Sequence, residues 1–518
     1  MKRMSTLAAP MSSRRGRLRA RTNPDIEVVD DETICDDHRA MAYPQLGLRI
    51  HDRWVTQSAG APLVVLDPAE GQAIAELPTA GAADLESALR STTEGLAAWS
   101  ALLPYERWRI LARGTALLRE RAAVIAAVLT LEQGKPLAEA RREVDLAADI
   151  IDFLAEEARR LGGRGVPPRQ RPVASQTVMR VPVGAVAAFT PWNFPANLPA
   201  RKLGAALAAG CSVIIKPAAE TPGTCIEIVR ALVDGGLPDG VLNLVAGDPA
   251  WISSTLIADP RIAKVSFTGS TAVGRQLGEL AGRHLKRCTT ELGGHAPVIV
   301  CADVDAAAVA ALAVTAKFRN AGQVCASPIR FLVQRARYAE FRDAFVDGAR
   351  ALRVGRGDTP GVQFGPLIRE HRLRAMQGLV DDALGRGARL LCGGHRLDRP
   401  GFFYAPTVLE GAPADSRVQR EEPFGPIALL DVFDDLDDAL ARANALPYGL
   451  AAYGFTHDTR HAHRLAQGLR AGMVGINHFG ISQPELPFGG VGDSGIGHES
   501  GLEGLLGYTD LKLVSIAP

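Results

Sequence analysis

The 518-residue sequence has no excess of charge of either sign and no long hydrophobic run. Its 58 basic residues are balanced by 57 acidic ones, giving a formal net charge of +1. This balance offers no electrostatic basis for nucleic acid or an anionic membrane surface as a partner. The longest apolar stretch near a motif, Gly204 to Ile215, is shorter than the roughly 18–20 residues that a membrane span needs. We therefore expect neither a nucleic acid nor a membrane as partner.

Cysteine is also scarce. The seven cysteines are Cys35, Cys211, Cys225, Cys288, Cys301, Cys325 and Cys392. Seven is odd, and no two have the Cys-x-x-Cys spacing of a zinc or redox site, so we predict no metal site. Such usage suits a reducing cytosol with most thiols buried as small hydrophobes, and we expect a cytoplasmic protein.

The chain is long and rich in turn residues. One hydrophobic core rarely grows past about 250–300 residues, so the length predicts two large domains. The 53 glycines and 33 prolines indicate many turns between regular elements, as in α/β enzymes.

Residues 1–40 differ from the rest. Basic residues alone occur up to Arg21, and an acidic block follows from Asp25 to Asp37. Without an apolar region this is no secretory signal. We predict a disordered N-terminal extension or an upstream start. A mitochondrial transit peptide is the alternative, but the acidic block argues against extending it past residue 24.

Hydrophobic periodicity predicts helices from Asp84 to Leu161, interrupted at Gly134-Lys135-Pro136. Strands and helices then alternate, which indicates a doubly wound parallel sheet that binds ligands at the carboxyl ends of its strands. The predicted strands are Val183–Phe189, Ser212–Ile215, Leu242–Ala246, Val265–Thr268 and Val298–Cys301, with helices at Ala200–Ala209 and Cys225–Val233. After residue 302 the rhythm restarts, with helix Ala306–Ala316, strand Phe331–Gln334 and helix Tyr338–Leu352, which predicts a second α/β domain.

Polar or reactive residues lie among glycine and proline at the ends of predicted strands. The segments are Thr190-Pro-Trp-Asn-Phe-Pro195, Lys216-Pro-Ala-Ala-Glu-Thr-Pro222, Phe267-Thr-Gly-Ser-Thr-Ala-Val-Gly274 with Glu291-Leu-Gly-Gly294, and Gly322-Gln-Val-Cys325. Glu421-Glu-Pro-Phe-Gly-Pro426 and Pro487-Phe-Gly-Gly-Val-Gly-Asp-Ser-Gly495 follow. In this order, the six motifs resemble those of the aldehyde dehydrogenase superfamily, and the resemblance runs from about residue 45 to the C-terminus.

The resemblance implies an α/β fold with two doubly wound domains and a small β oligomerisation arm. A discontinuous dinucleotide-binding domain would comprise residues 41–161 and 183–294, and the catalytic domain residues 295–498. The arm would comprise 162–182 and 499–518, in which Pro172–Val181 and Gly507–Ser515 are short, partly alternating segments that would otherwise leave exposed strand edges. A homodimer or homotetramer would follow.

Three residues match the family's catalytic positions. Cys325 corresponds to the nucleophile that forms a thiohemiacetal and then a thioester with the substrate, chemistry that needs a soft nucleophile that is also a good leaving group. Asn193 corresponds to the oxyanion donor. Glu291 corresponds to the general base that activates the hydrolytic water. Because relatives that pass the acyl group to coenzyme A often lack this glutamate, its presence favours release of a free acid.

The cofactor would be NAD or NADP. Gly269 to Gly274 follows a strand and opens a helix, a natural seat for pyrophosphate. Lys216 would reach the adenosine ribose, and Glu422 with Phe424 would bind the nicotinamide ribose. Where NAD-preferring members often carry glutamate this chain has Ala219, followed by Glu220, which predicts tolerance of NADP. The predicted cofactor residues are Thr190, Pro191, Trp192, Lys216, Ala219, Glu220, Gly269, Ser270, Gly274, Leu292, Gly293, Glu422 and Phe424.

Two arginines suggest the substrate. Arg201 and Arg319 would face the substrate channel, where a guanidinium pair binds a carboxylate bidentately. Members resembling succinate-semialdehyde dehydrogenase carry this pair with a loop serine, for which Ser482 is the candidate. The sequence therefore predicts oxidation of succinate semialdehyde or a related ω-carboxylated semialdehyde.

Four other functions remain open. The enzyme could act on uncharged aldehydes, or it could acylate coenzyme A. A cysteine hydrolase would need a histidine base, and no histidine lies within ten residues of Cys325; His295 is interpreted as structural. A catalytically silent structural or binding protein on this fold would be expected to lose some of Cys325, Glu291 and Asn193, and all three are present.

Overall fold

The helical pattern predicted from Asp84 to Leu161 forms four helices in the computed structural model, which describes residues 43–57 and 60–518. They are α1 (Ala82–Ser100), α2 (Pro104–Glu120), α3 (Ala122–Gln133) and α4 (Leu137–Ala158). The interruption comes where it was predicted. Gly134 ends α3 with a φ of 93°, a left-handed conformation that favours glycine, and Pro136 precedes α4. The prediction for residues 1–40 lies outside the described part of the chain.

An eight-stranded sheet forms the centre of the first lobe. Its spatial order is β19 (Gly495–Ile496), β11 (Arg287–Glu291), β10 (Ile262–Thr268), β7 (Ala185–Phe189), β8 (Val213–Lys216), β9 (Leu242–Leu244), β1 (Leu48–Ile50) and β2 (Arg53–Val55). The five strands from β11 to β9 run parallel, and the others are antiparallel additions at the edges. The four strands predicted between residues 183 and 268 are confirmed, whereas β11 and the edge strands were not predicted.

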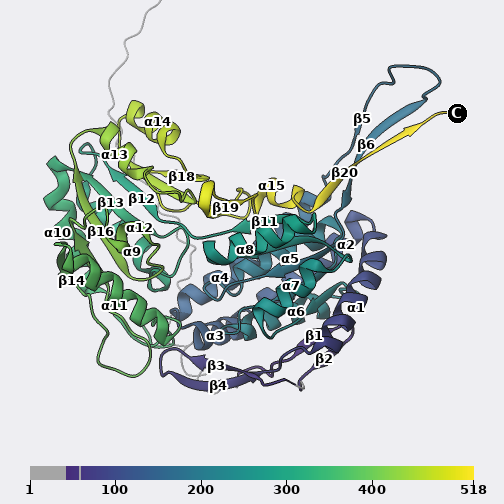
Figure 1. Cartoon of the computed structure of the whole chain (residues 1–518), viewed down its shortest axis with the longest axis horizontal. Helices are drawn as coiled ribbons and strands as arrows, with labels where there is room; N and C mark the ends of the chain where they lie inside the picture. The colour runs from purple at the N-terminus through teal and green to yellow at the C-terminus, as the bar shows by residue number, and fades with distance from the viewer. Residues whose placement is uncertain (1–42, 58–59) are drawn as a thin grey trace, which may run out of the picture. The chain divides into compact units, whose positions relative to one another are not determined.

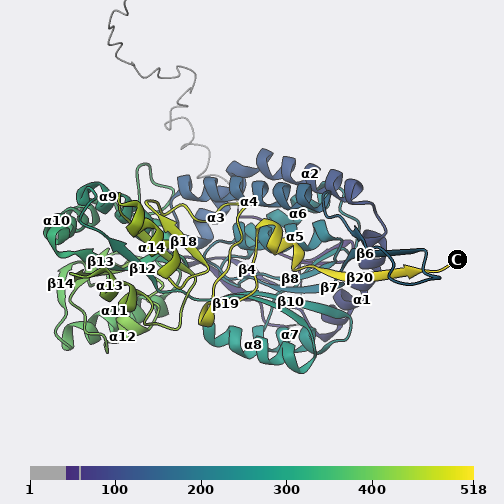
Figure 2. The same cartoon turned by 90° about the horizontal axis from the view of Figure 1, so that it is seen from above.

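Helices cover both faces of this sheet. Figure 2 shows α5 and α6 on one face and α7 and α8 on the other, while α2, α3 and α4 pack on α5 and α6. Their bounds are α5 (Asn197–Ala209), α6 (Pro222–Asp234), α7 (Pro249–Ala258) and α8 (Thr271–Arg283). Because every residue of α5 is buried, this helix presents no polar face to solvent. The first lobe is therefore doubly wound, as predicted.

A seven-stranded sheet forms the second lobe (Figure 1). Its order is β14 (Arg389–Cys392), β15 (Thr407–Glu410), β16 (Ile427–Phe433), β13 (Pro328–Gln334), β12 (Ala296–Val300), β17 (Ala451–Phe455) and β18 (Met473–Ile476). Its helices are α9 (Ala306–Phe318), α10 (Arg335–Ala351), α11 (Glu370–Gly385), α12 (Arg417–Arg420), α13 (Leu436–Ala443) and α14 (Thr459–Gly468). All neighbouring strands are parallel except β14 and β15. Each lobe has its own large hydrophobic core.

A three-stranded sheet extends away from the first lobe and carries the C-terminus (Figure 1). It consists of β20 (Thr509–Ile516), β6 (Ser175–Pro182) and β5 (Arg164–Gly165), with Thr509 opposite Pro182 and Ile516 opposite Ser175. The two segments proposed from the sequence thus pair with each other. Within residues 499–518 only β20 joins this sheet, because α15 (Gly501–Leu506) packs against α4 and α5 instead. A separate hairpin is formed by β3 (Leu63–Asp67) and β4 (Gln72–Leu77).

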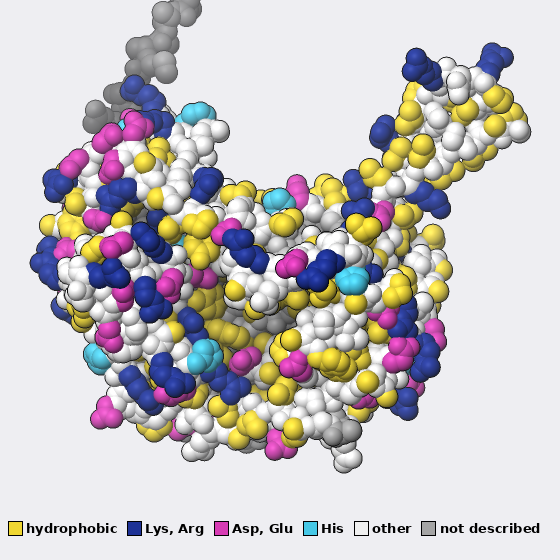
Figure 3. Space-filling model, in the orientation of Figure 1, with side chains coloured by type: hydrophobic (Ala, Val, Ile, Leu, Met, Phe, Trp, Pro, Cys, Tyr) yellow, Lys and Arg dark blue, Asp and Glu magenta, His cyan; other side chains and the backbone are white. Residues whose placement is uncertain are grey.

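In the described residues, no helix combines the length and apolarity needed to cross a membrane. Acidic and basic side chains are interspersed over the face shown in Figure 3.

Candidate active site

The parallel strands β11, β10, β7 and β8 of the first sheet have their carboxyl ends at the same edge of the sheet, and predicted site residues lie at or just after these ends. Phe189 of β7 lies opposite Phe267 of β10 and Lys216 of β8, while Thr268 lies opposite Glu291. This register brings segments more than one hundred residues apart in the sequence to the same place. The arrangement is the one expected of a parallel sheet, in which the carboxyl ends of the strands form the binding edge.

A cavity of about 310 Å³ lies at this edge and contains all three predicted catalytic residues, Cys325, Glu291 and Asn193. Eight of the predicted cofactor residues also line it: Pro191, Trp192, Gly269, Ser270, Leu292, Gly293, Glu422 and Phe424. Thr190, Lys216, Ala219, Glu220 and Gly274 do not line it, nor do Arg201, Arg319 and Ser482. The remaining lining residues are Leu198, Thr268, His371 and Arg372, none of which was predicted.

The thiol of Cys325 is kept protonated by its surroundings. Burial raises its pKa to about 12, and the nearby carboxylates of Glu422 and Glu291 add to the effect, while Arg201 opposes it. A thiolate, the reactive form, therefore requires removal of the proton by a base or a change in the site's charge. Gly294 packs against the Cys325 carbonyl: a Cβ at Gly294 would lie 2.6 Å from that oxygen.

Hydrogen bonds to its backbone carbonyl hold Asn193 in place, whereas its side-chain amide keeps part of its hydrogen-bonding capacity unused. Its carbonyl accepts hydrogen bonds from Lys135 Nζ and Asn320 Nδ2, both at 2.9 Å. Its amide donates to the Gln323 carbonyl at 3.0 Å, and its Oδ1 has no partner. Because an amide nitrogen carries two hydrogens, one N–H remains for a further acceptor beside Cys325.

Glu291 is buried, and neither of its carboxylate oxygens is hydrogen-bonded to any of the residues that the structure describes. Burial raises its pKa well above the ordinary value, and Glu499 raises it further, against the opposing charges of Lys202 and Arg201. A buried carboxylate without partners is costly unless it has a role, and a raised pKa suits a general base that works near neutral pH.

A buried ion pair joins Lys202 of α5 to Glu499, close enough to Glu291 to act on its pKa. Lys202 Nζ also donates to Thr268 Oγ1 at 2.8 Å and to Ser266 Oγ at 3.1 Å. Neither charged residue was predicted, because 297 residues separate them and neither falls in a strand-end segment. Their charges set the protonation of Glu291 in opposite directions.

The part of the cavity beside the start of α8 suits a dinucleotide. Ser270 caps α8 by accepting from Val273 N–H, so the first-turn amides of this 13-residue helix face the cavity edge, where an anionic group is favoured. Gly293 makes room for Glu422, since a Cβ there would lie 2.4 Å from Glu422 Oε2. Trp192 and Phe424 meet edge to face at 5.5 Å. These residues fit a pyrophosphate and its ribose.

Glu422 and Arg372 both line the cavity, and the charge of Arg372 acts on the Glu422 carboxylate. Burial raises the pKa of Glu422 to about 7, and its Oε1 accepts from Gly294 N–H at 3.0 Å. Arg372 of α11 donates to the Phe424 carbonyl at 3.2 Å, and its Nε has no partner. This guanidinium thus adds a cation from the second lobe that the sequence motifs did not reveal.

The predicted lysine and its neighbours lie beyond the cavity. Lys216 Nζ donates only to the adjacent Pro217 carbonyl, at 3.3 Å, and burial lowers its pKa against the raising effect of Glu220. Gly274 has a packing role: a Cβ there would come within 2.2 Å of Leu292.

The three predicted substrate residues lie at two different positions in the structure. Arg201 is buried, donates to Ser482 Oγ at 2.7 Å, and stacks 4.2 Å from the centre of the Phe488 ring. Its Nη1 has no partner. Arg319 instead lies over the Phe194 ring at 5.7 Å and lines a second cavity. In the described part of the chain Arg201 thus contacts Ser482, whereas no hydrogen bond joins Arg319 to either residue, so the three do not form one cluster.

No histidine lies within ten residues of Cys325 in the sequence, but His371 of α11 lines the same cavity. Burial and the neighbouring Arg372 lower its pKa. His295, by contrast, is buried beside Cys325's loop with Nε2 at 3.0 Å from the Val418 carbonyl, and burial lowers its pKa to about 3, in keeping with a structural role. Among the described residues, no group of three histidine, cysteine or acidic side chains is placed to hold a metal ion.

Comparison with known proteins agrees with this geometry. The sequence profile of the aldehyde dehydrogenase family matches residues 54–514. A 4-(hydroxymethyl)benzenesulfonate dehydrogenase from Comamonas testosteroni is 49% identical over 87% of this chain and 94% of its own length. The NADP-dependent succinate-semialdehyde dehydrogenase of Escherichia coli K12 is 40% identical over 90% of this chain and 97% of its own.

The fold is shared with solved structures. The crystal structure of a succinate-semialdehyde dehydrogenase from Burkholderia pseudomallei superimposes with a TM-score of 0.89 at 40% identity, covering 91% of this chain and 98% of that one. The α/β fold implied by the motifs is thereby confirmed.

Proposed function

Because this chain belongs to the aldehyde dehydrogenase family, whose members oxidise aldehydes with NAD or NADP, we propose that its substrate is an aldehyde carrying an anionic group. Succinate semialdehyde and its ω-carboxylated relatives are the first candidates. The product would be the free acid, released from a thioester on Cys325. The observation that carries the thioester chemistry is the convergence of Cys325, Asn193 and Glu291 in one cavity. The observation that favours an anionic substrate is the Nη1 of Arg201, which has no hydrogen-bond partner among the described residues.

Cys325 would act once its proton has been removed. The sulfur then forms a bond to the aldehyde carbon, and the carbonyl oxygen becomes an oxyanion. The free N–H of Asn193 and the backbone N–H of Cys325 are the donors for that oxyanion. A bound nicotinamide dinucleotide would supply the acceptor for the hydride that leaves the same carbon, and Ser270, Glu422, Trp192 and Phe424 would hold it.

Glu291 would serve the second half of the reaction. It takes a proton from a water molecule as the water oxygen attacks the thioester carbon, and the carbon–sulfur bond breaks to release the acid and the thiolate. The pKa of Glu291, raised by burial, brings this base toward neutral pH. The buried Lys202–Glu499 pair would tune this base, since Glu499 raises the pKa of Glu291 and Lys202 lowers it.

The cofactor preference follows from residues beside Lys216. Ala219 leaves no carboxylate to repel a 2′-phosphate, and Lys216 has no carboxylate partner within hydrogen-bonding distance. Glu220 is near enough to raise the lysine pKa but does not bind it. We therefore expect NADP to be accepted as well as NAD. A preference for NAD above about 100-fold in kcat/KM, nearly 3 kcal/mol, would contradict this.

The anion would meet Arg201 and Ser482. Among the described residues, Nη1 of the Arg201 guanidinium has no hydrogen-bond partner, and burial lowers the Arg201 pKa against the raising effect of Glu499 and Glu291. A buried guanidinium nitrogen without an acceptor is costly in the free protein, and a carboxylate on the substrate would relieve that cost. Arg319 would contribute from the neighbouring cavity.

The arm of β5, β6 and β20 would build a homodimer or homotetramer. Leu511, Leu513 and Ile516 are 65%, 63% and 55% exposed on β20. Figure 3 shows hydrophobic side chains over this arm. An exposed edge of this kind is a template for pairing with another chain.

A substrate panel tests the proposal. Succinate semialdehyde, glutarate semialdehyde, butanal and benzaldehyde are each assayed at 340 nm with NAD and with NADP, in the presence and absence of coenzyme A. We expect the carboxylated aldehydes to have the higher kcat/KM without coenzyme A. A strict requirement for coenzyme A would indicate acyl transfer, and ester turnover with no reduced cofactor would indicate a hydrolase.

A further inference from the structure

The turn between α9 and Cys325 has an unusual backbone conformation. It comprises Arg319–Gly322, and its members Asn320, Ala321 and Gly322 have φ values of 49°, 53° and 71°. These values lie in the left-handed region, which is unfavourable for a residue such as alanine and open to glycine without penalty. Two consecutive non-glycine residues persist in this conformation only where neighbouring groups hold them there. The turn that leads directly to Cys325 therefore depends on contacts from outside it.

Asn320 links this turn to the predicted oxyanion donor. Its Nδ2 donates to the Asn193 carbonyl at 2.9 Å, and its Oδ1 accepts from Gln133 Nε2 at 2.8 Å. Its own carbonyl accepts from the Gln323 N–H at 3.0 Å. The Gln323 carbonyl in turn accepts from the Asn193 side chain, also at 3.0 Å. The conformation of the turn thus determines where Asn193 lies relative to Cys325.

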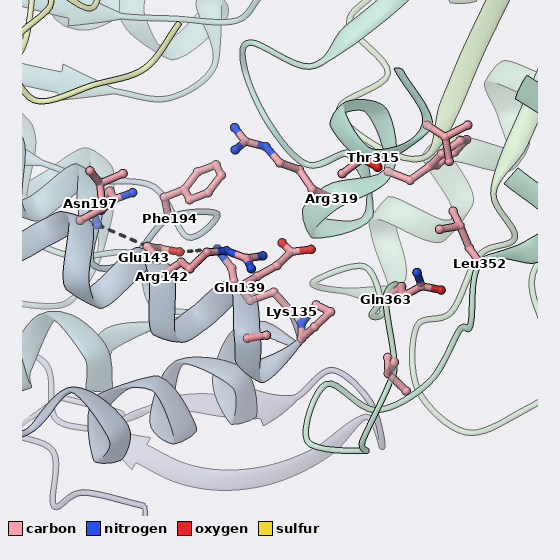
Figure 4. Close-up of a pocket in the computed structure, with 16 residues that line it drawn as sticks. Lys135, Glu139, Arg142, Glu143, Phe194, Asn197, Thr315, Arg319, Leu352 and Gln363 are labelled. Carbon is pink, nitrogen blue, oxygen red and sulfur yellow. Dashed lines mark hydrogen bonds and ion pairs between the residues drawn. The ribbon is translucent and has the colours of Figure 1, made fainter. Parts of the chain in front are cut away.

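A carboxylate of α4 holds the turn. The Arg319 N–H makes the last helical hydrogen bond of α9, to the Thr315 carbonyl, and the next N–H, that of Asn320, donates to Glu139 Oε2 at 3.0 Å. Glu139 projects from the first turn of α4 into a cavity of about 580 Å³ that Arg319 also lines (Figure 4). Burial raises the pKa of Glu139, whereas the charges of Lys135 and Arg319 and the hydrogen bond from Asn320 lower it. This carboxylate therefore engages the turn through both a hydrogen bond and charge.

The next carboxylate on the same face of α4 holds the other half of the site. Glu143 lies four residues after Glu139, a spacing that places both side chains on one face of the helix. Its Oε1 accepts from the Ala196 N–H at 2.9 Å and the Asn197 N–H at 3.3 Å. Helix α4 therefore presents one carboxylate to the segment that follows Asn193 and another to the turn before Cys325.

We propose that Glu139 is a positioning residue for Cys325, which it serves by accepting the Asn320 N–H and so holding the turn in its left-handed conformation. The turn then keeps the Cys325 backbone N–H and the Asn193 amide at the separation that binding of one oxyanion requires. Because Glu139 does not line the cavity of Cys325, its effect on the rate is indirect. This inference rests on the proposed function, and it concerns a residue outside all six motifs of the sequence.

The test measures the first half of the reaction in Glu291→Gln, in which the thioester should accumulate and one burst of reduced cofactor counts the working sites. Glu139→Leu, added to this variant, removes the acceptor and keeps much of the side chain's volume. With succinate semialdehyde and NADP, we expect the rate constant of the burst at 340 nm to fall by about tenfold or more, as for loss of a charged hydrogen bond. The amplitude should stay at one per chain. Glu139→Gln, which still offers an oxygen, should lose less than about threefold.

Further variants separate positioning from a general effect on the fold. Glu156→Leu removes a carboxylate of α4 that pairs with Arg159 at the surface, and as the matched control it should change neither the rate constant nor the amplitude. Ala321→Gly removes the methyl group that disfavours the left-handed conformation, so it should raise the rate constant of Glu139→Leu by about threefold or more. If Glu139→Leu does not fold, Glu139→Asp takes its place, because aspartate keeps the charge and is one methylene shorter.

Several results would overturn the positioning role. An unchanged rate constant, with or without a smaller burst, would mean that Glu139 at most stabilises the fold. Equal losses in Glu139→Gln and Glu139→Leu would mean that its charge matters rather than its hydrogen bond, and no recovery with Ala321→Gly would break the link to the turn. Each of these results leaves the proposed function standing as long as Glu291→Gln itself gives a burst. If it gives none with any aldehyde of the panel and either cofactor, the proposed function fails, and the positioning role with it.

Discussion

Replacing Lys135 by methionine tests the network that holds Asn193 in place. Lys135 is buried at the break between α3 and α4, where it pairs with Glu143 and donates to the Asn193 carbonyl. Methionine keeps most of the side chain's volume and removes only the charge and its hydrogen bonds. Glu143 would then be a buried carboxylate without its cation, although its bonds to the first amides of α5 would remain.

The expected cost is set mainly by the charge left behind. Breaking a buried ion pair by removing one partner costs about 3–5 kcal/mol, because the remaining ion has neither water nor a partner. Loss of the bond to the Asn193 carbonyl adds less, about 1 kcal/mol, since Asn320 still donates to it at 2.9 Å. We expect the free energy of unfolding to fall by about 4–6 kcal/mol.

Activity should fall too, and in a particular way. Removing an oxyanion donor outright costs about 100- to 1,000-fold in turnover, whereas a loosened donor should cost less, on the order of tenfold. The loss should appear in kcat, with the KM for the cofactor unchanged, because Lys135 does not line the cavity of Cys325.

Urea denaturation followed by fluorescence gives the stability change, and Lys135→Met/Glu143→Gln is the matched control. Glutamine has no charge but still offers an oxygen to the amides of Ala196 and Asn197, so the double variant should recover most of the lost stability. If the double variant is as unstable as the single one, lost packing rather than an uncompensated charge explains the effect, and the reasoning is refuted.

Three further predictions concern the site itself. Asn193→Ala should lower kcat by about 100- to 1,000-fold with little change in cofactor Kd, measured by calorimetry; a loss below tenfold would mean that another group stabilises the oxyanion. Arg372→Ala should weaken NADP binding about tenfold, whereas the exposed Arg374→Ala should not, as titration of tryptophan fluorescence would show; equal effects would exclude a cofactor contact for Arg372. Cys325 and Glu291 act unprotonated and both have raised pKa values, so kcat/KM should climb with pH from 6 to 9, and a plateau below pH 7 would contradict those shifts.

The fold could be predicted from local patterns where those patterns are strong. Short apolar runs bounded by glycine and proline identified the parallel strands β7, β8 and β10, and helical periodicity identified α1 to α4. The edge strands β1, β2 and β19 carry no such pattern, because two or three residues are too few to show a period. Their positions depend on tertiary pairing, as in Glu291 opposite Gly495.

The same distinction between local patterns and long-range contacts holds for the residues of the candidate site. Residues at or just beyond strand ends, such as Glu291 and Asn193, stand in recognisable motifs and meet at one cavity. Their supports could not be predicted, because Gln133 binds Asn320 across 187 residues and Lys202 binds Glu499 across 297. One signal was available: Lys135 is a charged residue inside a helix junction that is otherwise built from glycine and proline.

The most direct test of the account is to trap the thioester in Glu291→Gln. Removing the base should slow hydrolysis by about 100- to 10,000-fold while leaving the first half of the reaction intact. Mixed with succinate semialdehyde and NADP and quenched within seconds, this variant should yield one reduced cofactor per chain in a burst, with peptide mass spectrometry showing the acyl group on Cys325. An acyl group on another cysteine, or steady turnover with Cys325 unmodified, would contradict the central claim.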